Sequence, residues 1–231
     1  MDLSVNWEGA DKSLDRKVEL LEKATQRDPN FALAYCALAK TQIDLRDLHW
    51  NPEQEHEEAA KKAAEAALRL RPDLGETHLE LARYYYYVGI STGDYDRARD
   101  ELAIVRRKLP NNAEALMIRA QIDRHQNRWD ASLANLQKAN DLDPRNDVVA
   151  WRLRQIYFEM HRYSDLEQLQ TKQAVSGILG EPEFKRLLAY TKLAQGDPIA
   201  AQSLLEQVPM DYSPDFWIWE TRFTAALYLR D

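Results

Sequence analysis

The chain contains 231 residues, of which 45% are apolar and 30% are charged, and it carries a formal charge of −7. Its seven glycines are too few for the turns of an all-β protein, and the abundance of alanine, leucine, glutamate and arginine favours helices. No run approaches the roughly 18 apolar residues of a membrane span, the single cysteine favours a reducing, cytoplasmic location, and the acidic charge argues against nucleic-acid binding.

Apolar residues recur at helical spacing along the chain, and prolines interrupt them. The spacing predicts about twelve helices, over residues 13–27, 31–47, 53–70, 74–91, 94–108, 112–126, 129–141, 146–160, 163–175, 182–195, 197–208 and 214–230. Pro29, Pro72, Pro110 and Pro144 are 43, 38 and 34 residues apart, and each follows a small residue by five positions, namely Ala24, Ala67, Val105 and Ala139. Because proline ends a helix and small residues let helices approach, the pattern predicts an all-α repeat protein.

One repeat carries a run of four tyrosines. Four extra residues before Gly93 add about one turn to its first helix. On this helix we expect Tyr85 to face the core, and Tyr86 and Tyr87 to lie on the side of Arg83.

The unit at 113–146 shows the repeat most clearly. Its helices carry Leu116, Ala120, Trp129, Leu136 and Ala139, and Pro144 follows the second helix. These residues resemble the tetratricopeptide repeat (TPR), a helix pair with a period of about 34 residues. The resemblance implies an α-solenoid of stacked antiparallel helix pairs with a right-handed superhelical twist.

The same resemblance divides residues 1–231 as a single array. It gives a half-repeat at 13–30, repeats at about 31–74, 75–112, 113–146, 147–181 and 182–213, and a terminal helix at 214–230. Free-standing arrays end in complete, polar repeats, whereas the last helix contains Phe216, Trp217 and Trp219. We therefore expect a fragment of a longer protein. The segment at 21–35 is similar to the TPR tails of large bacterial signalling proteins.

TPR arrays use a concave groove lined by the first helix of each repeat to hold a peptide or a partner protein. The groove positions of this family fall on Leu33, Cys36, Lys40, Leu79, Arg83, Tyr86, Tyr87, Met117, Gln121, Arg124, His125, Val148, Trp151, Gln155 and Phe158. The mixture of aromatic, arginine and glutamine side chains suits peptide recognition. The resemblance therefore implies a protein-interaction scaffold with a protein or peptide partner. The Lys/Asn clamp of chaperone-binding TPR proteins is not reproduced.

Two other functions remain as alternatives. The aromatic helix at 214–230 could form a homodimer, and a helical solenoid could sense a small ligand. An enzyme is not expected, because no catalytic motif is present and no cofactor is implied. His49 and His56 lack further ligands at metal-binding spacing.

A histidine, the cysteine and a basic triplet are expected to have structural roles. His78 is expected to be a packed core histidine, and Cys36 a small buried or groove-facing residue without a neighbouring base. Residues 106–108, Arg-Arg-Lys, end a helix, where cations favourably oppose the helix dipole. A basic docking patch is the alternative interpretation of this triplet.

Overall fold

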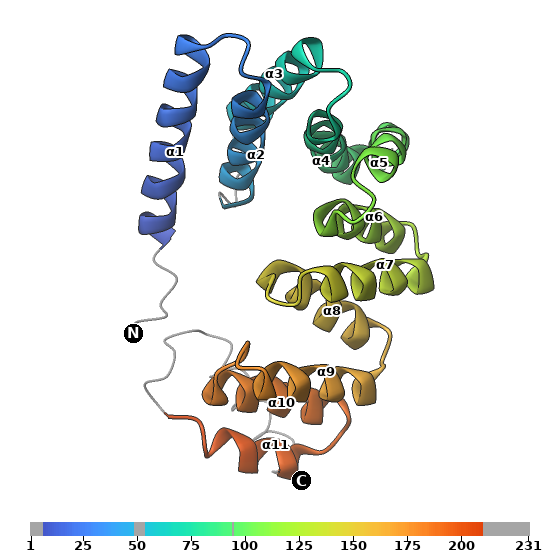
Figure 1. Cartoon of the computed structure of the whole chain (residues 1–231). Coiled ribbons are helices and arrows are strands. Elements are labelled where there is room, and N and C mark those ends of the chain that lie inside the picture. Colours follow the sequence, from blue (N-terminus) through green and yellow to red (C-terminus); the bar gives the residue numbers. More distant parts are fainter. Residues whose placement is uncertain (1–6, 49–53, 94, 210–231) are drawn as a thin grey trace. The chain divides into compact units, whose positions relative to one another are not determined.

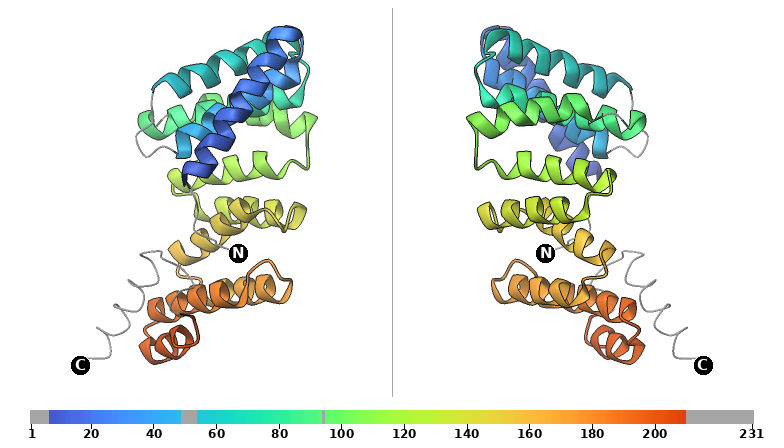
Figure 2. Two further views of the ribbon diagram at one scale, coloured as in Figure 1. Left: turned by 90° about the vertical axis from the view of Figure 1, so that its left-hand side faces the viewer. Right: turned by 90° about the vertical axis from the view of Figure 1, so that its right-hand side faces the viewer.

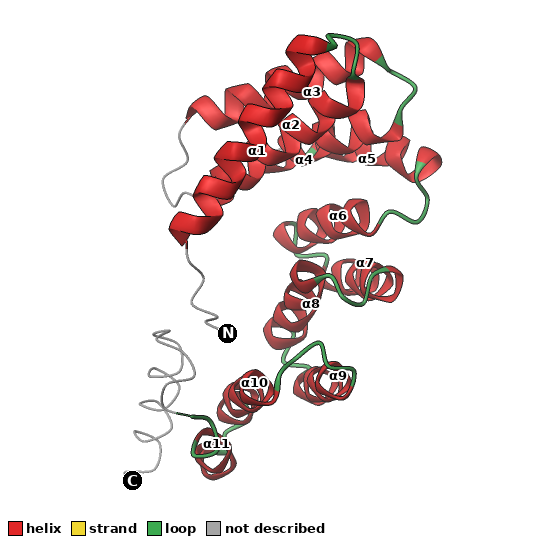
Figure 3. Cartoon of the chain, turned by 60° about the vertical axis from the view of Figure 1, so that its left-hand side comes forward, coloured by secondary structure: helices red, strands yellow, loops and turns green. Residues whose placement is uncertain are grey.

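The computed structural model describes residues 7–48, 54–93 and 95–209, and within these ranges all regular secondary structure is helical (Figures 1 and 3). The described helices are α1 (Trp7–Arg27), α2 (Ala32–Leu48), α3 (Gln54–Leu70), α4 (Gly75–Thr92), α5 (Asp96–Lys108), α6 (Ala113–His125), α7 (Trp129–Leu142), α8 (Asp147–Glu159), α9 (Tyr163–Val175), α10 (Glu181–Ala194) and α11 (Pro198–Leu205). They confirm eleven predicted helices. The main difference is α1, which begins six residues before the predicted residue 13, because no proline interrupts the helix there.

The chain divides into two compact units, one of residues 5–142 with α1–α7 and one from residue 143 onward with α8–α11. The predicted helix at 214–230, with its aromatic residues and the dimer that it suggested, lies outside the described residues. The single continuous array and its repeat boundaries stay predictions.

In the first unit, consecutive helices form the pairs α2/α3, α4/α5 and α6/α7, and α1 packs against α2 (Figure 2). Three of the four predicted small residues, Ala67, Val105 and Ala139, have no exposed surface within the helix pairs, whereas Ala24 of α1 is half-buried. Ala82 and Ala120, from the first helices, are equally buried. Close approach of two helices requires small side chains at the crossing, because larger ones would separate the backbones.

The second unit contains the pairs α8/α9 and α10/α11. Ala189 and Ala201 are fully buried at the crossing of α10 and α11. In the α8/α9 pair, Arg154 and Gln173 take the places that small residues take elsewhere, and Arg154 Nη1 donates to Gln173 Oε1 at 2.8 Å. These two helices pack less closely than the other pairs. The long polar side chains explain the separation.

The turns inside the helix pairs share one backbone geometry. Gly93, Asn127, His161 and Gly196 adopt positive φ angles of 74°, 58°, 56° and 79°, and they recur at intervals of 34, 34 and 35 residues. A left-handed residue there lets the chain leave the first helix and enter the second. Glycine adopts this conformation freely, whereas a side chain at the same φ costs about 1 kcal/mol.

We expect opposite effects from two substitutions in these turns. Gly93→Ala should lower the free energy of unfolding by about 1 kcal/mol, and His161→Gly should raise it by about 0.5 kcal/mol, because only glycine is unstrained at positive φ. Urea unfolding followed by circular dichroism measures both. His161→Ala is the control, since it also removes the 2.9 Å hydrogen bond between Tyr163 Oη and His161 Nδ1 but keeps a side chain. Equal stabilisation by alanine and glycine would contradict the backbone explanation.

Candidate partner-binding surface on the first helices

A chain of charged side chains joins the first helices of three consecutive repeats in the first unit. On α4, Arg83 Nε donates to Glu80 Oε2 at 3.0 Å, and Arg83 Nη2 donates to Glu114 of α6. Lys40 Nζ of α2 lies 3.6 Å from Glu114 Oε1. Three helices that are distant in sequence are thus connected through two cations and two carboxylates.

Burial makes this network unlike a surface ion pair. The side chains of Arg83 and Glu80 are each 7% exposed, whereas that of Lys40 is 42% exposed. Burial raises the pKa of Glu80, and Arg83 and then Lys40 oppose the rise, while nearby Asp44 adds to it. Arg83, predicted to face a ligand, is therefore occupied within the protein. Lys40 is the member of the network that a partner can reach.

The structure corrects the assignment of the tyrosines on α4. Tyr86, predicted to line the groove, is buried together with Leu79 in the core cluster of the α4/α5 pair, and its ring stacks on Tyr95 at 6.2 Å. Tyr85, predicted to be the core residue, is half-buried and packs against two core clusters. The buried positions 79, 82, 86 and 89 follow the spacing of one helix face. Leu79 and Tyr86 are thus core residues and offer little surface to a partner.

Tyr87 keeps a half-buried ring that borders the surface. The guanidinium of Arg46 from α2 lies over this ring, 5.0 Å from its centroid. Arg46 Nε also lies 3.6 Å from Glu57 Oε2 of α3. Tyr87 is therefore held by a cation–π contact rather than projecting freely.

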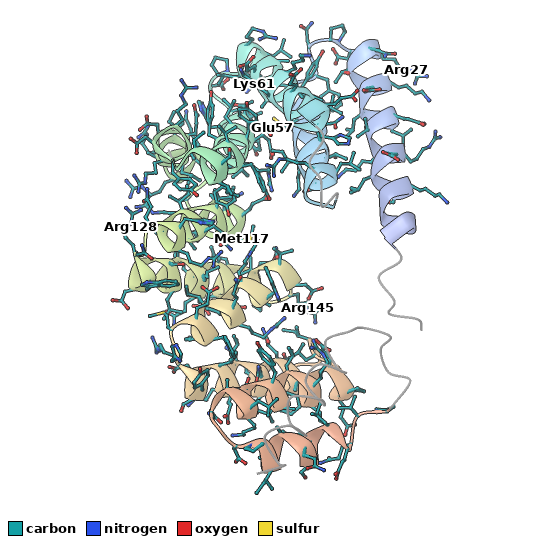
Figure 4. The ribbon with its side chains drawn as sticks, turned by 180° about the vertical axis from the view of Figure 1, so that it is seen from behind. Arg27, Glu57, Lys61, Met117, Arg128 and Arg145 are labelled. Atoms are coloured by element: carbon teal, nitrogen blue, oxygen red, sulfur yellow. The ribbon has the colours of Figure 1, made fainter. Side chains whose placement is uncertain are left out.

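Helix α6 contributes a mixed polar and apolar face. Met117 is half-buried (labelled in Figure 4), and Arg124 Nε donates to Gln121 Oε1 at 3.3 Å. Gln121 is itself buried. His125 is exposed, and its ring stacks on Tyr95 at 5.7 Å. Met117, Arg124 and His125 are therefore the predicted residues of α6 that remain accessible.

In the second unit, aromatic rings dominate the corresponding face. Trp151 of α8 is 49% exposed. Phe158 lies two turns further along α8 and stacks on Tyr190 of α10 at 5.0 Å. Gln155, between them, donates from Nε2 to Glu159 Oε1 at 2.8 Å. The predicted residues Trp151, Gln155 and Phe158 thus share one face of α8.

Tyr190 belongs to this face, although sequence reasoning did not select it. It stands six residues before Gly196, as Gln155 stands six residues before His161. Counting back from the turn would have identified it. The ring is 46% exposed, so it extends the aromatic surface of Phe158 from α8 onto α10.

The residues considered for other chemistry have structural partners. His78 is buried, as predicted, with Nδ1 2.6 Å from Glu101 Oε2 and Nε2 3.0 Å from the Pro72 carbonyl oxygen. His56 Nδ1 lies 2.8 Å from Gln42 Oε1.

Cys36 is also buried, as one of its two predicted placements required. Its burial, with smaller contributions from Glu80 and Glu76, raises the pKa of the thiol to about 12. A thiol with so high a pKa stays protonated at neutral pH and is a poor nucleophile.

Two further features are absent from the described residues. These residues include no group of three or more His, Cys, Asp and Glu side chains that could hold a metal ion. None of the helices in this part of the chain combines the length and apolar character needed to cross a membrane.

Solved structures with the same arrangement of helices are TPR proteins. The chain is similar to a chain of the APC/C hetero-tetramer Cut9–Hcn1, with a TM-score of 0.69 and 14% identity over 93% of this chain and 40% of that chain. PilW, a type IV pilus biogenesis factor, gives a TM-score of 0.69 and 14% identity, with 90% of both chains covered. YrrB, a TPR protein with an unusual peptide-binding site, gives 0.56 and 14%, with 89% of this chain and 99% of YrrB covered.

These similarities establish the fold. At such low identity they do not transfer a partner or an activity, and the chain spans less than half of the Cut9–Hcn1 chain that it matches. No protein-family profile and no curated protein sequence matches the chain. The chain has the all-helical TPR fold, as the resemblance of its repeats implied.

Proposed function

We propose that this chain is a non-catalytic scaffold that binds a peptide or a partner protein on the exposed surface of its first helices. The charge network from Lys40 through Glu114 and Arg83 to Glu80 carries this proposal. It fixes α2, α4 and α6 to one another, so the surface above it is organised before a partner arrives. Preorganisation lowers the entropic cost of binding.

The accessible side chains of that surface are suited to a peptide. Lys40 and Arg124 can pair with carboxylates or donate to backbone carbonyls, and Met117 offers an adaptable apolar contact. The second unit has exposed rings of its own, Trp151 and Tyr190, and tyrosine and tryptophan are enriched at binding hot spots. The proposal thus moves the predicted site away from Leu79, Arg83 and Tyr86.

The test begins with a pull-down that uses the whole chain as bait, followed by titration of the purified partner. We expect Arg124→Glu and Trp151→Ala each to weaken binding at least about tenfold, because hot-spot substitutions cost about 2 kcal/mol or more and about 1.4 kcal/mol is a factor of ten. Lys138→Glu is the matched control for charge, since Lys138 is exposed on the second helix α7. If neither variant changes the affinity, or if the control weakens binding equally, the first-helix surface is not the binding site.

A further inference from the structure

A cluster of exposed cations lies where the second helices of two neighbouring repeats end. Arg69 is in the last turn of α3 and Arg71 follows that helix. Arg106, Arg107 and Lys108 form the last turn of α5. All five side chains are exposed, and we call them the basic edge.

Packing brings the two helix ends together. A Cβ atom placed on Gly75, the first residue of α4, would lie 3.0 Å from Lys108 Cβ and 2.7 Å from Leu109 Cγ. The end of α5 therefore rests on the beginning of α4, two residues after Asp73. A hydrogen bond from Arg71 is the largest cause that lowers the pKa of Asp73, and Lys108 adds a smaller effect. Arg71 and Lys108 thus both favour the ionised form of Asp73.

Asp73 balances only part of this charge. Arg71 occupies it with two hydrogen bonds, from Nε at 3.0 Å and from Nη2 at 3.1 Å. Positions 102–108 of α5 contain no acidic residue, so the last three cations have no carboxylate one turn earlier on their own helix. Leu74, at the N-terminus of α4, provides no capping side chain, and the free N–H groups there add positive potential. Glu76, half-buried in the first turn of α4, and Glu101, which is held by His78, are further opposing charges of α4 and α5.

Two other exposed cations of the same unit, by contrast, have carboxylate partners on their own helix. On α3, Lys61 Nζ lies 3.9 Å from Glu65 Oε1 and Lys62 Nζ lies 3.9 Å from Glu58 Oε2, each pair four residues apart. The helix dipole explains a cation at the end of α5. The dipole does not require three cations in succession, with two more at the end of α3, in a chain whose formal charge is −7.

We propose that the basic edge is a second docking surface, which binds an acidic segment of a partner protein. Arginine forks bind carboxylates in a bidentate manner, and a short run of Asp or Glu residues matches several cations grouped at one edge. A long polyanion such as nucleic acid is a poorer match, because the excess of acidic residues elsewhere on the chain repels it. This surface is distinct from the first-helix surface and does not depend on it.

The test uses the whole chain and a fluorescein-labelled octaglutamate peptide, with anisotropy measured at about 20 mM and about 150 mM NaCl. We expect saturable binding that weakens with salt. Arg106→Glu/Arg107→Glu should reduce the affinity at least about tenfold. Lys61→Glu/Lys62→Glu makes the same change in net charge on α3, where Figure 4 labels Lys61. This variant should reduce the affinity less than about threefold.

Three results would overturn the proposal. The first is the absence of saturable octaglutamate binding at the lower salt concentration, and the second is an equal loss of affinity in the two charge-reversal variants. The third is that an octathymidylate or phosphatidylserine vesicles bind more tightly than octaglutamate and lose this binding in Arg106→Glu/Arg107→Glu. Circular dichroism verifies that both variants are folded, and Arg106→Gln/Arg107→Gln gives a milder second test. Arg124→Glu should leave octaglutamate binding unchanged within about twofold, which separates this surface from the proposed function.

Discussion

Replacing Arg83 by alanine should lower the free energy of unfolding by about 3 kcal/mol or more. Removal of one partner of a buried ion pair leaves the other charge without compensation, and Glu80 is only 7% exposed. Urea unfolding at neutral pH measures the effect. Arg99→Ala is the matched control, because its ion pair with Asp96, also three residues away on its helix, is exposed. We expect the control to cost less than about 1 kcal/mol.

The same variant should show a characteristic dependence on pH. Arg83 is the main influence that keeps the pKa of Glu80 from rising further, so its removal increases the pKa of that carboxyl group in the folded state. A carboxyl group whose pKa is higher in the folded than in the unfolded state stabilises the fold at a pH below its unfolded-state pKa. That stabilisation is lost as the pH rises through its folded-state pKa. The deficit of Arg83→Ala should therefore shrink between about pH 7.5 and about pH 4.5.

Two double variants make this prediction decisive. Arg83→Ala/Glu80→Gln should lose the change in deficit with pH, since the titrating group is gone. Glu80→Leu/Arg83→Met should recover most of the stability, because apolar residues of similar volume can replace a buried ion pair. A deficit that is constant with pH in Arg83→Ala would show that lost packing, and not the charge of Glu80, causes the effect.

The second large effect should appear at the crossing of α8 and α9. Arg154→Ala and Gln173→Ala should each destabilise the protein by about 2 kcal/mol, because each breaks a hydrogen bond between a half-buried cation and a buried amide. Burial already lowers the pKa of Arg154, so its charge is held at a cost. The Nε2 atom of Gln173 is buried without a hydrogen-bond partner.

The double variant Arg154→Ala/Gln173→Ala should cost far less than the sum of the two single variants. It restores the small residues found at the crossings of the other pairs, where Ala120 and Ala139 are fully buried. We expect a coupling free energy of about 2 kcal/mol from a double-mutant cycle of thermal or urea unfolding. Additive effects would mean that the two side chains act independently, despite the 2.8 Å hydrogen bond between them.

The fold could be predicted from sequence because its signals are local. Proline and a left-handed glycine end helices without help from distant residues, and the small residues at 67, 105 and 139 recur in register with the prolines. Asn127 and His161 were harder to recognise as turn residues, since neither is glycine, although both adopt positive φ. Their spacing from Gly93 reveals them once the backbone is known.

The candidate site could be predicted only in part. Family positions selected accessible residues such as Lys40, Met117 and Trp151, but also Leu79 and Tyr86, which are buried. A periodic pattern assigns a residue to a face of its helix. It does not determine how deeply neighbouring helices cover that face.

The amino-acid sequence by itself determined the helical repeat, its breaks and the absence of a recognisable catalytic motif, because these depend on residues close together in the chain. Only the tertiary structure decided that Arg83 is enclosed between Glu80 and Glu114, and that the ends of α3 and α5 meet at Asp73. These two arrangements depend on contacts between residues about 30 or more positions apart in the sequence. The free energy of an ionic group in such a contact is determined by its burial and by its partners from other helices.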